Sequence, residues 1–251
     1  MIELIKGDCL EVMKSIPDGS IDAIITDPPY GTTACKWDSV IDFGLMWEQL
    51  NRIIKPNGAI VLFGSEPFSS ALRMSNIKNY KYDWIWQKDK AGNFALANKH
   101  PMKYHEIVSV FYNKQCLYNK QMIERSEGGK KRNKTPHNYN NKKVDSSINN
   151  ELSRKSLGVV NYDINTKNPS TILKYNKQVG LHPTQKPIAL MEYLIKTYTN
   201  EGETVLDFTM GSGSTMVACD NLNRNGIGIE MDEAYFKIAE QRIKQNANKL
   251  F

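Results

Sequence analysis

The chain has 251 residues, of which 40% are hydrophobic and 24% are charged, an ordinary composition for a globular protein that predicts one main domain with an insertion. It has no run of 18 or more apolar residues and no signal-like N-terminus, so we expect a cytoplasmic protein without a membrane partner. The four cysteines are scattered and no histidine lies at ligand spacing, so neither a metal site nor a disulfide framework is predicted.

Residues 1–112 alternate short apolar runs with amphipathic stretches, as expected for strand–helix units. Residues 21–26 are apolar at nearly every position except Asp22, which is typical of a strand covered on both faces. Pro28 and Pro29 end this strand. The predicted strands of this region are 2–5, 21–26, 59–63, 82–87 and 106–112, and the predicted helices are 10–15, 43–54 and 67–75.

The segment 113–180 has few apolar residues and carries most of the excess positive charge. It holds fourteen Lys or Arg against five Asp or Glu, whereas the formal net charge of the whole chain is only +6. We therefore predict an inserted region with a polyanionic partner. Regular patterning resumes afterwards, with predicted helices at 187–199, 214–222 and 233–246 and predicted strands at 204–208 and 226–229.

This alternation predicts an α/β fold, namely a doubly wound, mostly parallel sheet. In such sheets ligands bind beyond the carboxyl ends of the strands. Asp27 and Asp207 each stand at a predicted strand end of this kind. The sequence therefore indicates two half-sites, one after the strand that precedes Asp27 and one after the strand that leads to Asp207.

The second half-site resembles a nucleotide-binding turn. Gly211 and Gly213 allow close approach to a ligand, and the next helix offers free backbone N–H groups. Glu230, about twenty residues on, is placed to accept from two ribose hydroxyls. Met216 stands where a third glycine would be expected and no phosphate-loop lysine follows, which disfavours nicotinamide and ATP. A tight strand–helix turn without a ligand is the alternative.

The first half-site, Asp27-Pro28-Pro29-Tyr30, combines a carboxylate, a rigid backbone and an aromatic ring. An exocyclic amine on a planar base needs two acceptors, which Asp27 and the Pro28 carbonyl can supply, and a face for stacking, which Tyr30 can supply at about 1 to 3 kcal/mol. The alternative is that the two prolines merely terminate a strand.

Together these segments resemble the S-adenosylmethionine-dependent DNA amino-methyltransferases, in particular the circularly permuted beta group of adenine-N6 enzymes. In that group the catalytic motif precedes the cofactor motif, as it does here. The resemblance implies a methyltransferase domain formed by residues 1–112 and 181–251, with the catalytic half first, and a target-recognition region at 113–180. It covers most of the chain, and only the basic insertion has no recognisable pattern.

The resemblance also implies the roles of individual residues and the cofactor, S-adenosylmethionine. Asp27, Pro28, Pro29 and Tyr30 form the implied catalytic motif. The implied cofactor-binding residues are Asp8, Cys9, Leu10, Asp27, His182, Thr184, Lys186, Pro187, Asp207, Phe208, Thr209, Gly211, Gly213, Ser214, Thr215, Glu230 and Met231.

The implied substrate is adenine in double-stranded DNA, turned out of the helix so that its amino group reaches Asp27. Asp27 orients the amine and stabilises the positive charge that develops on it. Cytosine-N4 needs the same acceptors, and an aspartate at this position favours adenine as a tendency. The sequence also leaves open an RNA or protein-glutamine amino-methyltransferase of the same fold, and a catalytically silent DNA-binding subunit.

Within the insertion, the basic run Lys130, Lys131, Arg132 and Lys134 is the predicted DNA-binding segment, with an exposed loop as the alternative. A homodimer and a separate restriction endonuclease are compatible with the resemblance. The recognition sequence cannot be deduced, because it depends on which side chains reach the base edges.

Overall fold

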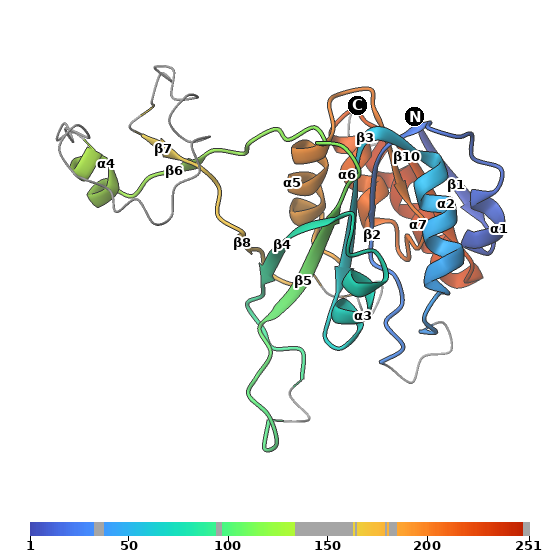
Figure 1. The fold of residues 1–251 in the computed structure, drawn as a ribbon, viewed down its shortest axis with the longest axis horizontal. Helices are drawn as coiled ribbons and strands as arrows, with labels where there is room; N and C mark the ends of the chain where they lie inside the picture. The colour runs from blue at the N-terminus through green and yellow to red at the C-terminus, as the bar shows by residue number, and fades with distance from the viewer. Residues whose placement is uncertain are drawn as a thin grey trace. The chain divides into compact units, whose positions relative to one another are not determined.

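The computed structural model describes residues 1–32, 38–93, 97–133, 163, 165–178, 180 and 185–247 (Figure 1). The chain divides into a larger unit, Met1–Asn119 with Ser170–Phe251, and a smaller unit, Lys120–Pro169. Within the described ranges, none of the helices has the length and apolar character needed to cross a membrane.

The larger unit is built on an eight-stranded sheet with the order β1-β10-β9-β2-β3-β5-β4-β8. All neighbouring strands are parallel except β5, which runs antiparallel to β3 and β4. The strands are β1 (Ile2–Lys6), β2 (Ile21–Thr26), β3 (Ile54–Gly64), β4 (Tyr80–Gln87), β5 (His105–Phe111), β8 (Ile172–Lys174), β9 (Thr204–Asp207) and β10 (Asn225–Glu230).

Helices cover both faces of this sheet (Figure 1). One core cluster joins the sheet to α5 (Ile188–Tyr198), α6 (Ser214–Asn221) and α7 (Glu233–Ala247). The other joins it to α1 (Cys9–Met13), α2 (Phe43–Ile53) and α3 (Phe68–Ser75). Strand β2 contributes side chains to both clusters, because Ala23 and Ile25 face the first and Ile24 faces the second. This two-sided burial explains its nearly continuous apolar sequence.

The direct pairing of β2 with β9 positions the candidate site. Ala23 lies opposite Val205, and Ile24 lies opposite Leu206, in parallel register. The carboxyl ends of these two strands, which carry Asp27 and Asp207, therefore meet at one edge of the sheet. Chain segments about 180 residues apart are adjacent because β2 and β9 are neighbours in the sheet order.

Strand β3 differs from its prediction at its start. The predicted helix 43–54 and strand 59–63 leave 55–58 between them, but β3 begins at Ile54, which pairs with Ile21. The register then shifts, so that Ala23 pairs with Ala59. An irregularity of this kind accommodates Pro56, which lacks a backbone donor for the ladder.

The boundaries of the insertion also differ from the predicted 113–180. Asn119 N–H donates to Thr197 carbonyl oxygen at 2.8 Å, and β8 pairs with β4, opposite Ile85 to Gln87. These contacts assign 113–119 and the described part of 170–180 to the larger unit. The smaller unit has an antiparallel pair, β6 (Ile123–Glu124) with β7 (Thr166–Lys167), and helix α4 (Glu127–Asn133).

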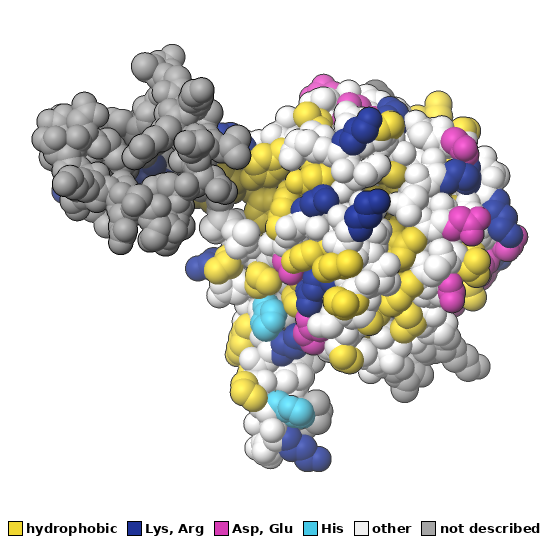
Figure 2. Space-filling view, in the orientation of Figure 1, with side chains coloured by type: hydrophobic (Ala, Val, Ile, Leu, Met, Phe, Trp, Pro, Cys, Tyr) yellow, Lys and Arg dark blue, Asp and Glu magenta, His cyan; other side chains and the backbone are white. Residues whose placement is uncertain are grey.

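One face of the larger unit carries dispersed charge. Figure 2 shows Lys and Arg side chains interspersed with acidic and apolar ones on the visible face. The connection between β4 and β5 projects from the sheet in Figure 1 and carries lysine and histidine.

Candidate active site

A cluster of polar side chains joins the ends of β2 and β9. We call Thr26, Asp207, Thr209 and Thr215 the Asp207 cluster. Asp207 accepts hydrogen bonds from the hydroxyls of Thr26 (2.6 Å) and Thr215 (2.5 Å) and from the Thr209 N–H (3.2 Å). Burial raises the pKa of Asp207 to about 6, although these donors oppose the rise. A buried carboxylate thus ties both strand ends together.

The Asp207 cluster also holds the backbone of Asp27. Thr209 Oγ1 lies 2.7 Å from Thr26 Oγ1 and 3.1 Å from the carbonyl oxygen of Asp27. Since the Thr26 hydroxyl donates to Asp207, the single hydrogen of Thr209 is shared between Thr26 Oγ1 and the Asp27 carbonyl. The position of Asp27 therefore depends on a residue that follows β9.

A second carboxylate, that of Asp38, holds the described residues at the end of the Asp27-Pro28-Pro29-Tyr30 motif and directly after it. Asp38 Oδ1 accepts from the N–H groups of Tyr30 (2.7 Å) and Gly31 (2.8 Å), and its Oδ2 accepts from Thr32 N–H (2.9 Å). Gly31 has φ +67°, a conformation that favours glycine. The backbone of residues 30–32 therefore curls around the Asp38 side chain.

The ring of Tyr30 already has partners within the protein. Its hydroxyl donates to Asp27 Oδ1, and its ring centroid lies 5.0 Å from that of Phe68. The sequence suggested only a stacking face here. The structure adds that Tyr30 and Asp27 are linked through the phenol.

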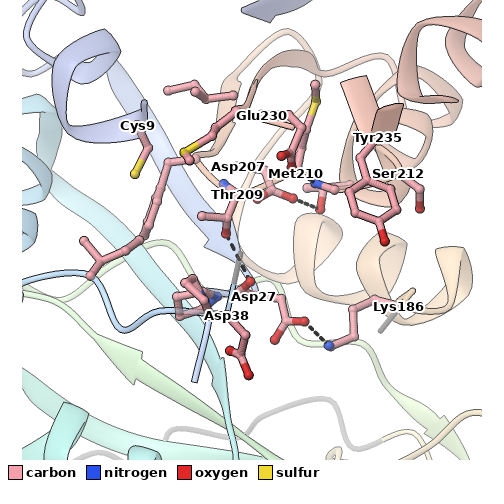
Figure 3. Close-up of a pocket in the computed structure, with 18 of the residues that line it drawn as sticks. Cys9, Asp27, Asp38, Lys186, Asp207, Thr209, Met210, Ser212, Glu230 and Tyr235 are labelled. Atoms are coloured by element: carbon pink, nitrogen blue, oxygen red, sulfur yellow. Dashed lines mark hydrogen bonds and ion pairs between the residues drawn. The ribbon is translucent and has the colours of Figure 1, made fainter. Parts of the chain in front are cut away.

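Asp27 belongs to a chain of alternating charges, which we call the charge network: Asp27, Lys186, Glu106 and Lys88. The two lysines are buried and the two carboxylates are partly buried. The Lys186 ammonium pairs with Asp27 Oδ2 and lies 3.5 Å from Glu106 Oε2 (Figure 3 shows the first pair). Lys88 pairs with the other oxygen of Glu106. The network brings together the ends of β2 and β4, the start of β5 and the segment before α5.

Burial and neighbouring charges oppose each other in the charge network. Burial raises the pKa of Asp27; Lys186 opposes the rise, and Glu106 adds to it. Burial disfavours the charged form of Lys186, but Asp27 and Glu106 together raise its pKa. Likewise, burial disfavours the charged form of Glu106, but its two lysine neighbours lower its pKa. Lys186 therefore stays a cation.

The turn after β9 presents backbone groups and a carboxylate. Gly211 (φ +52°) and Gly213 (φ +77°) have left-handed conformations, as a tight strand–helix turn requires. Glu230, at the end of β10, accepts from Gly211 N–H (2.9 Å) and Asp232 N–H (2.7 Å). Arg242 of α7 donates to the carbonyl oxygen of Ser212 (2.5 Å). The turn is therefore held from both sides.

The segment after β1 lines the remaining side of the site, at the same edge of the sheet as Asp27 and Asp207. Asp8 caps α1, because its side chain accepts from the N–H groups of Leu10 (2.8 Å) and Glu11 (3.3 Å). Burial raises the pKa of the Cys9 thiol to about 12, so Cys9 is an uncharged thiol rather than a nucleophile.

A cavity of about 280 Å³ opens between these segments and contains both half-sites (Figure 3). The predicted site residues that line it are Asp8, Cys9, Asp27, Pro28, Pro29, Tyr30, Lys186, Asp207, Phe208, Thr209, Gly211, Ser214, Thr215, Glu230 and Met231. Leu10, Pro187 and Gly213 do not line it, and they lie beside residues that do. His182 and Thr184 lie outside the described residues.

Sequence reasoning missed several residues at this edge. Asp38, Ser212 and Tyr235 line the cavity, and Glu106 contacts Lys186. No local pattern indicates Asp38, whose bonds reach back six to eight residues. No local pattern indicates Glu106 either, because its partners, Lys88 and Lys186, are distant in sequence.

The predicted DNA-binding run lies in the smaller unit. Lys130 pairs with Glu124 and Glu127, both at 2.9 Å. Lys131 is exposed, while the side chain of Arg132 and all of Lys134 lie outside the described part of the structure.

The sheet is mostly parallel, and its adjacent strand ends bring a Pro-Pro carboxylate motif and a glycine turn with an acidic partner into one cavity. These features are typical of α/β enzymes that bind a nucleoside-containing ligand. The model of the DNA methylase family (N6 and N4 methyltransferases) matches residues 21–241. The chain belongs to this family and is a DNA methyltransferase.

The curated relatives span most of this chain. It is 29% identical to the type II methyltransferase M.HpaI of Haemophilus parainfluenzae, over 98% of this chain and 75% of that protein. It is 28% identical to the DNA adenine methyltransferase YhdJ of Escherichia coli K12, over 96% of this chain and 82% of that protein.

Solved structures agree with the fold. A complex of M1.HpyAVI with SAM has a TM-score of 0.62 at 27% identity, covering 97% of this chain and 99% of that one. The cytosine-N4-specific PvuII methyltransferase has a TM-score of 0.64 at 15% identity, covering 99% and 92%, and shows the fold alone. The predicted family, enzyme class and fold class are therefore confirmed.

We expect Thr209→Val to weaken the junction between the half-sites. The substitution keeps the shape but removes the hydroxyl hydrogen shared by Thr26 and the Asp27 carbonyl, so the free energy of unfolding should fall by about 1 to 3 kcal/mol. Urea unfolding measures this loss, and methyl transfer to DNA should fall as well.

Thr197→Val is the matched control, because the Thr197 hydroxyl donates to Tyr193 within α5 at 2.7 Å, away from the cavity. It should lose stability without losing turnover. Equal turnover losses in both variants would contradict a positioning role for Thr209.

Proposed function

We propose that this chain transfers the methyl group of S-adenosylmethionine to the N6 amino group of an adenine turned out of double-stranded DNA. The observation that carries the proposal is the shared cavity, into which both the Asp27 motif and the Gly211–Glu230 turn open. A methyl donor and an amine acceptor have to meet in one such space.

The donor set of the cavity fits S-adenosylmethionine. Glu230 offers a carboxylate at the end of β10, where ribose hydroxyls are bound in folds of this type. Asp8 and the turn at Gly211 and Ser212 add polar groups, and Met210 and Ile229 add apolar ones. When bound, this group supplies an electrophilic methyl on a sulfonium. The proposed cofactor-binding residues are those named from the sequence that line the cavity, except Asp27 and Lys186, whose side chains pair with each other.

Asp27 and the Pro28 carbonyl are the proposed acceptors for the two hydrogens of the target amine. Accepting both hydrogens frees the nitrogen lone pair from the ring, and the Asp27 carboxylate stabilises the positive charge that develops on nitrogen. Tyr30 is the proposed stacking partner of the base. Positioning supplies much of the remaining rate enhancement.

Adenine is favoured over cytosine on two grounds. The relative YhdJ is named as a DNA adenine methyltransferase, and Asp27 stands at the first motif position. Both amines need the same acceptors, so the choice is tested by chemical analysis. Methylated DNA digested to nucleosides should yield N6-methyladenine, and N4-methylcytosine would overturn the adenine assignment.

The smaller unit is the proposed target-recognition region, and its exposed Lys131 a proposed phosphate contact. A homodimer, a separate restriction endonuclease and a cytoplasmic location stay predictions from the sequence. RNA and protein glutamine are the competing substrates. Assays that measure methyl transfer to duplex DNA, RNA and protein side by side distinguish among them.

We expect Asp27→Asn to lower methyl transfer by at least about 10² to 10³-fold, because the neutral amide cannot stabilise charge developing on the amine. Affinity for S-adenosylmethionine, measured by calorimetry, should persist. Asp22→Asn is the control, since Asp22 pairs with Lys55 at the opposite end of β2. Unchanged turnover of Asp27→Asn in a tritiated-methyl assay would refute the role.

Glu230→Gln should weaken S-adenosylmethionine binding about tenfold, because a charge-assisted acceptor becomes neutral. DNA binding should change little. Glu233→Gln is the control, as Glu233 pairs with Lys6 and Lys237 at the start of α7. Calorimetry that finds weaker DNA binding and intact cofactor binding would count against the assignment.

Lys131→Glu should reduce DNA affinity and make the salt dependence of binding shallower by about one unit of slope. Fluorescence anisotropy at several salt concentrations measures both quantities. Lys14→Glu is the control, because Lys14 follows α1 in the larger unit and precedes β2. An unchanged salt slope in Lys131→Glu would support an exposed loop without a DNA contact.

A further inference from the structure

The Lys186 ammonium lies between two carboxylates that come from different strands. It pairs with Asp27 at the end of β2 and lies 3.5 Å from Glu106 in β5, and the side chains of Asp27 and Lys186 point toward each other in Figure 3. The sequence assigned Lys186 to the cofactor. In the structure its ammonium contacts Asp27 and Glu106, and the residue also lines the cavity.

This lysine is enclosed by protein. Its residue is 6% exposed, and its ammonium lies 5.1 Å from the centre of the Phe63 ring. Water therefore screens the attraction between Lys186 and Asp27 less than it screens a surface pair, although the Asp27 side chain keeps 18% exposure on the cavity side. Glu106 is anchored in turn by Lys88, which is 8% exposed.

We propose that Lys186 is a positioning residue for catalysis: it holds the Asp27 carboxylate ionised and oriented toward the cavity, while Glu106 holds Lys186. Lys186 engages Asp27 Oδ2, and the Tyr30 hydroxyl engages Oδ1. The carboxylate is therefore fixed from two sides before any base arrives.

The charge balance explains why Glu106 is present. Under the proposed function, on which this step rests, the target amine becomes positively charged as it is methylated. An uncompensated lysine beside Asp27 would repel that charge. Glu106 offsets Lys186, so Asp27, Lys186 and Glu106 together keep one negative charge beside the amine. Lys88, which pairs with the other oxygen of Glu106, makes the four-membered network neutral as a whole.

The ionisable groups that face Asp27 come from several elements. They are Tyr30 of its own loop, Lys186 before α5, Glu106 of β5 and Asp207 of β9. Among them only Lys186 favours the ionised carboxylate by its charge, while Glu106 and Asp207 disfavour it. Removing Lys186 or Glu106 should therefore move the titration of Asp27 in opposite directions.

The test is the titration of Asp27 in the full-length enzyme, free of cofactor and DNA, labelled with ¹³C at the aspartate side-chain carboxyls. The Asp27→Asn variant identifies the Asp27 signal. In Lys186→Gln the midpoint should move to higher pH by about one unit or more. In Glu106→Gln it should move to lower pH, because a carboxylate that opposes ionisation is gone. Lys186→Arg should keep the midpoint near that of the parent.

Lys55→Gln is the matched control. Lys55 pairs with Asp22 at 2.6 Å, a lysine–aspartate pair at the other end of the same strand. Its loss should leave the Asp27 titration in place. If Lys186→Gln does not fold, two other variants still decide the proposal. The Asp27 titration midpoint should move to lower pH in Glu106→Gln and should not move in Lys55→Gln.

Turnover separates this inference from the proposed function. In the tritiated-methyl assay on DNA, the acid limb of the pH–rate profile should follow the NMR midpoints, and the affinity of Lys186→Gln for S-adenosylmethionine should match that of the parent. Shifted midpoints without methyl transfer by the parent would overturn the proposed function alone. Unshifted midpoints in an active parent, or cofactor affinity lost in Lys186→Gln, would overturn the positioning role.

Discussion

The candidate site depends on the buried carboxylate of Asp207 and the three hydroxyl-bearing residues around it. Strands β2 and β9 are hydrogen-bonded neighbours, but strand pairing alone does not fix the loops that follow them. Asp207 accepts hydrogen bonds from the hydroxyls of Thr26 and Thr215. The hydroxyl of Thr209 donates a further hydrogen bond to the Asp27 carbonyl oxygen. A buried carboxylate without partners would be costly, so the cluster is held by the need to satisfy Asp207.

This constraint makes the order of the two halves along the chain unimportant for the site. Asp27 comes before the glycine turn in sequence, and about 180 residues, including the smaller unit, separate them. What matters is that β2 and β9 are adjacent and parallel, so their carboxyl ends share an edge. The smaller unit is inserted without disturbing that edge, because the chain leaves at Asn119 and returns at Ser170, both outside β2 and β9.

Much of the fold was predictable because its signals are local. The apolar run of β2, the glycines at 211 and 213 and the acidic end of β10 each have a sequence pattern with a physical cause. Strand β8 was not predicted, since Ile172–Lys174 is short and becomes a strand only by pairing with the edge of β4. The contacts of Asp38, and those of Lys186 with Asp27 and Glu106, were hidden for a related reason. They join residues whose proximity is set by the tertiary fold, and no spacing rule relates them.

The two hydrogen-bond partners that Asp27 already has also bear on which substrates it can bind. Tyr30 and Lys186 each use one lone pair of the carboxylate, and an ionised carboxylate has about four acceptor sites. An incoming amine hydrogen can therefore be accepted without displacing either partner, so the geometry of the free site can persist in the complex. A ring carbonyl at the same position would bring an acceptor against an acceptor, leaving that carbonyl without a donor from Asp27 at a cost of about 1 to 3 kcal/mol. The arrangement thus favours bases that carry an amine.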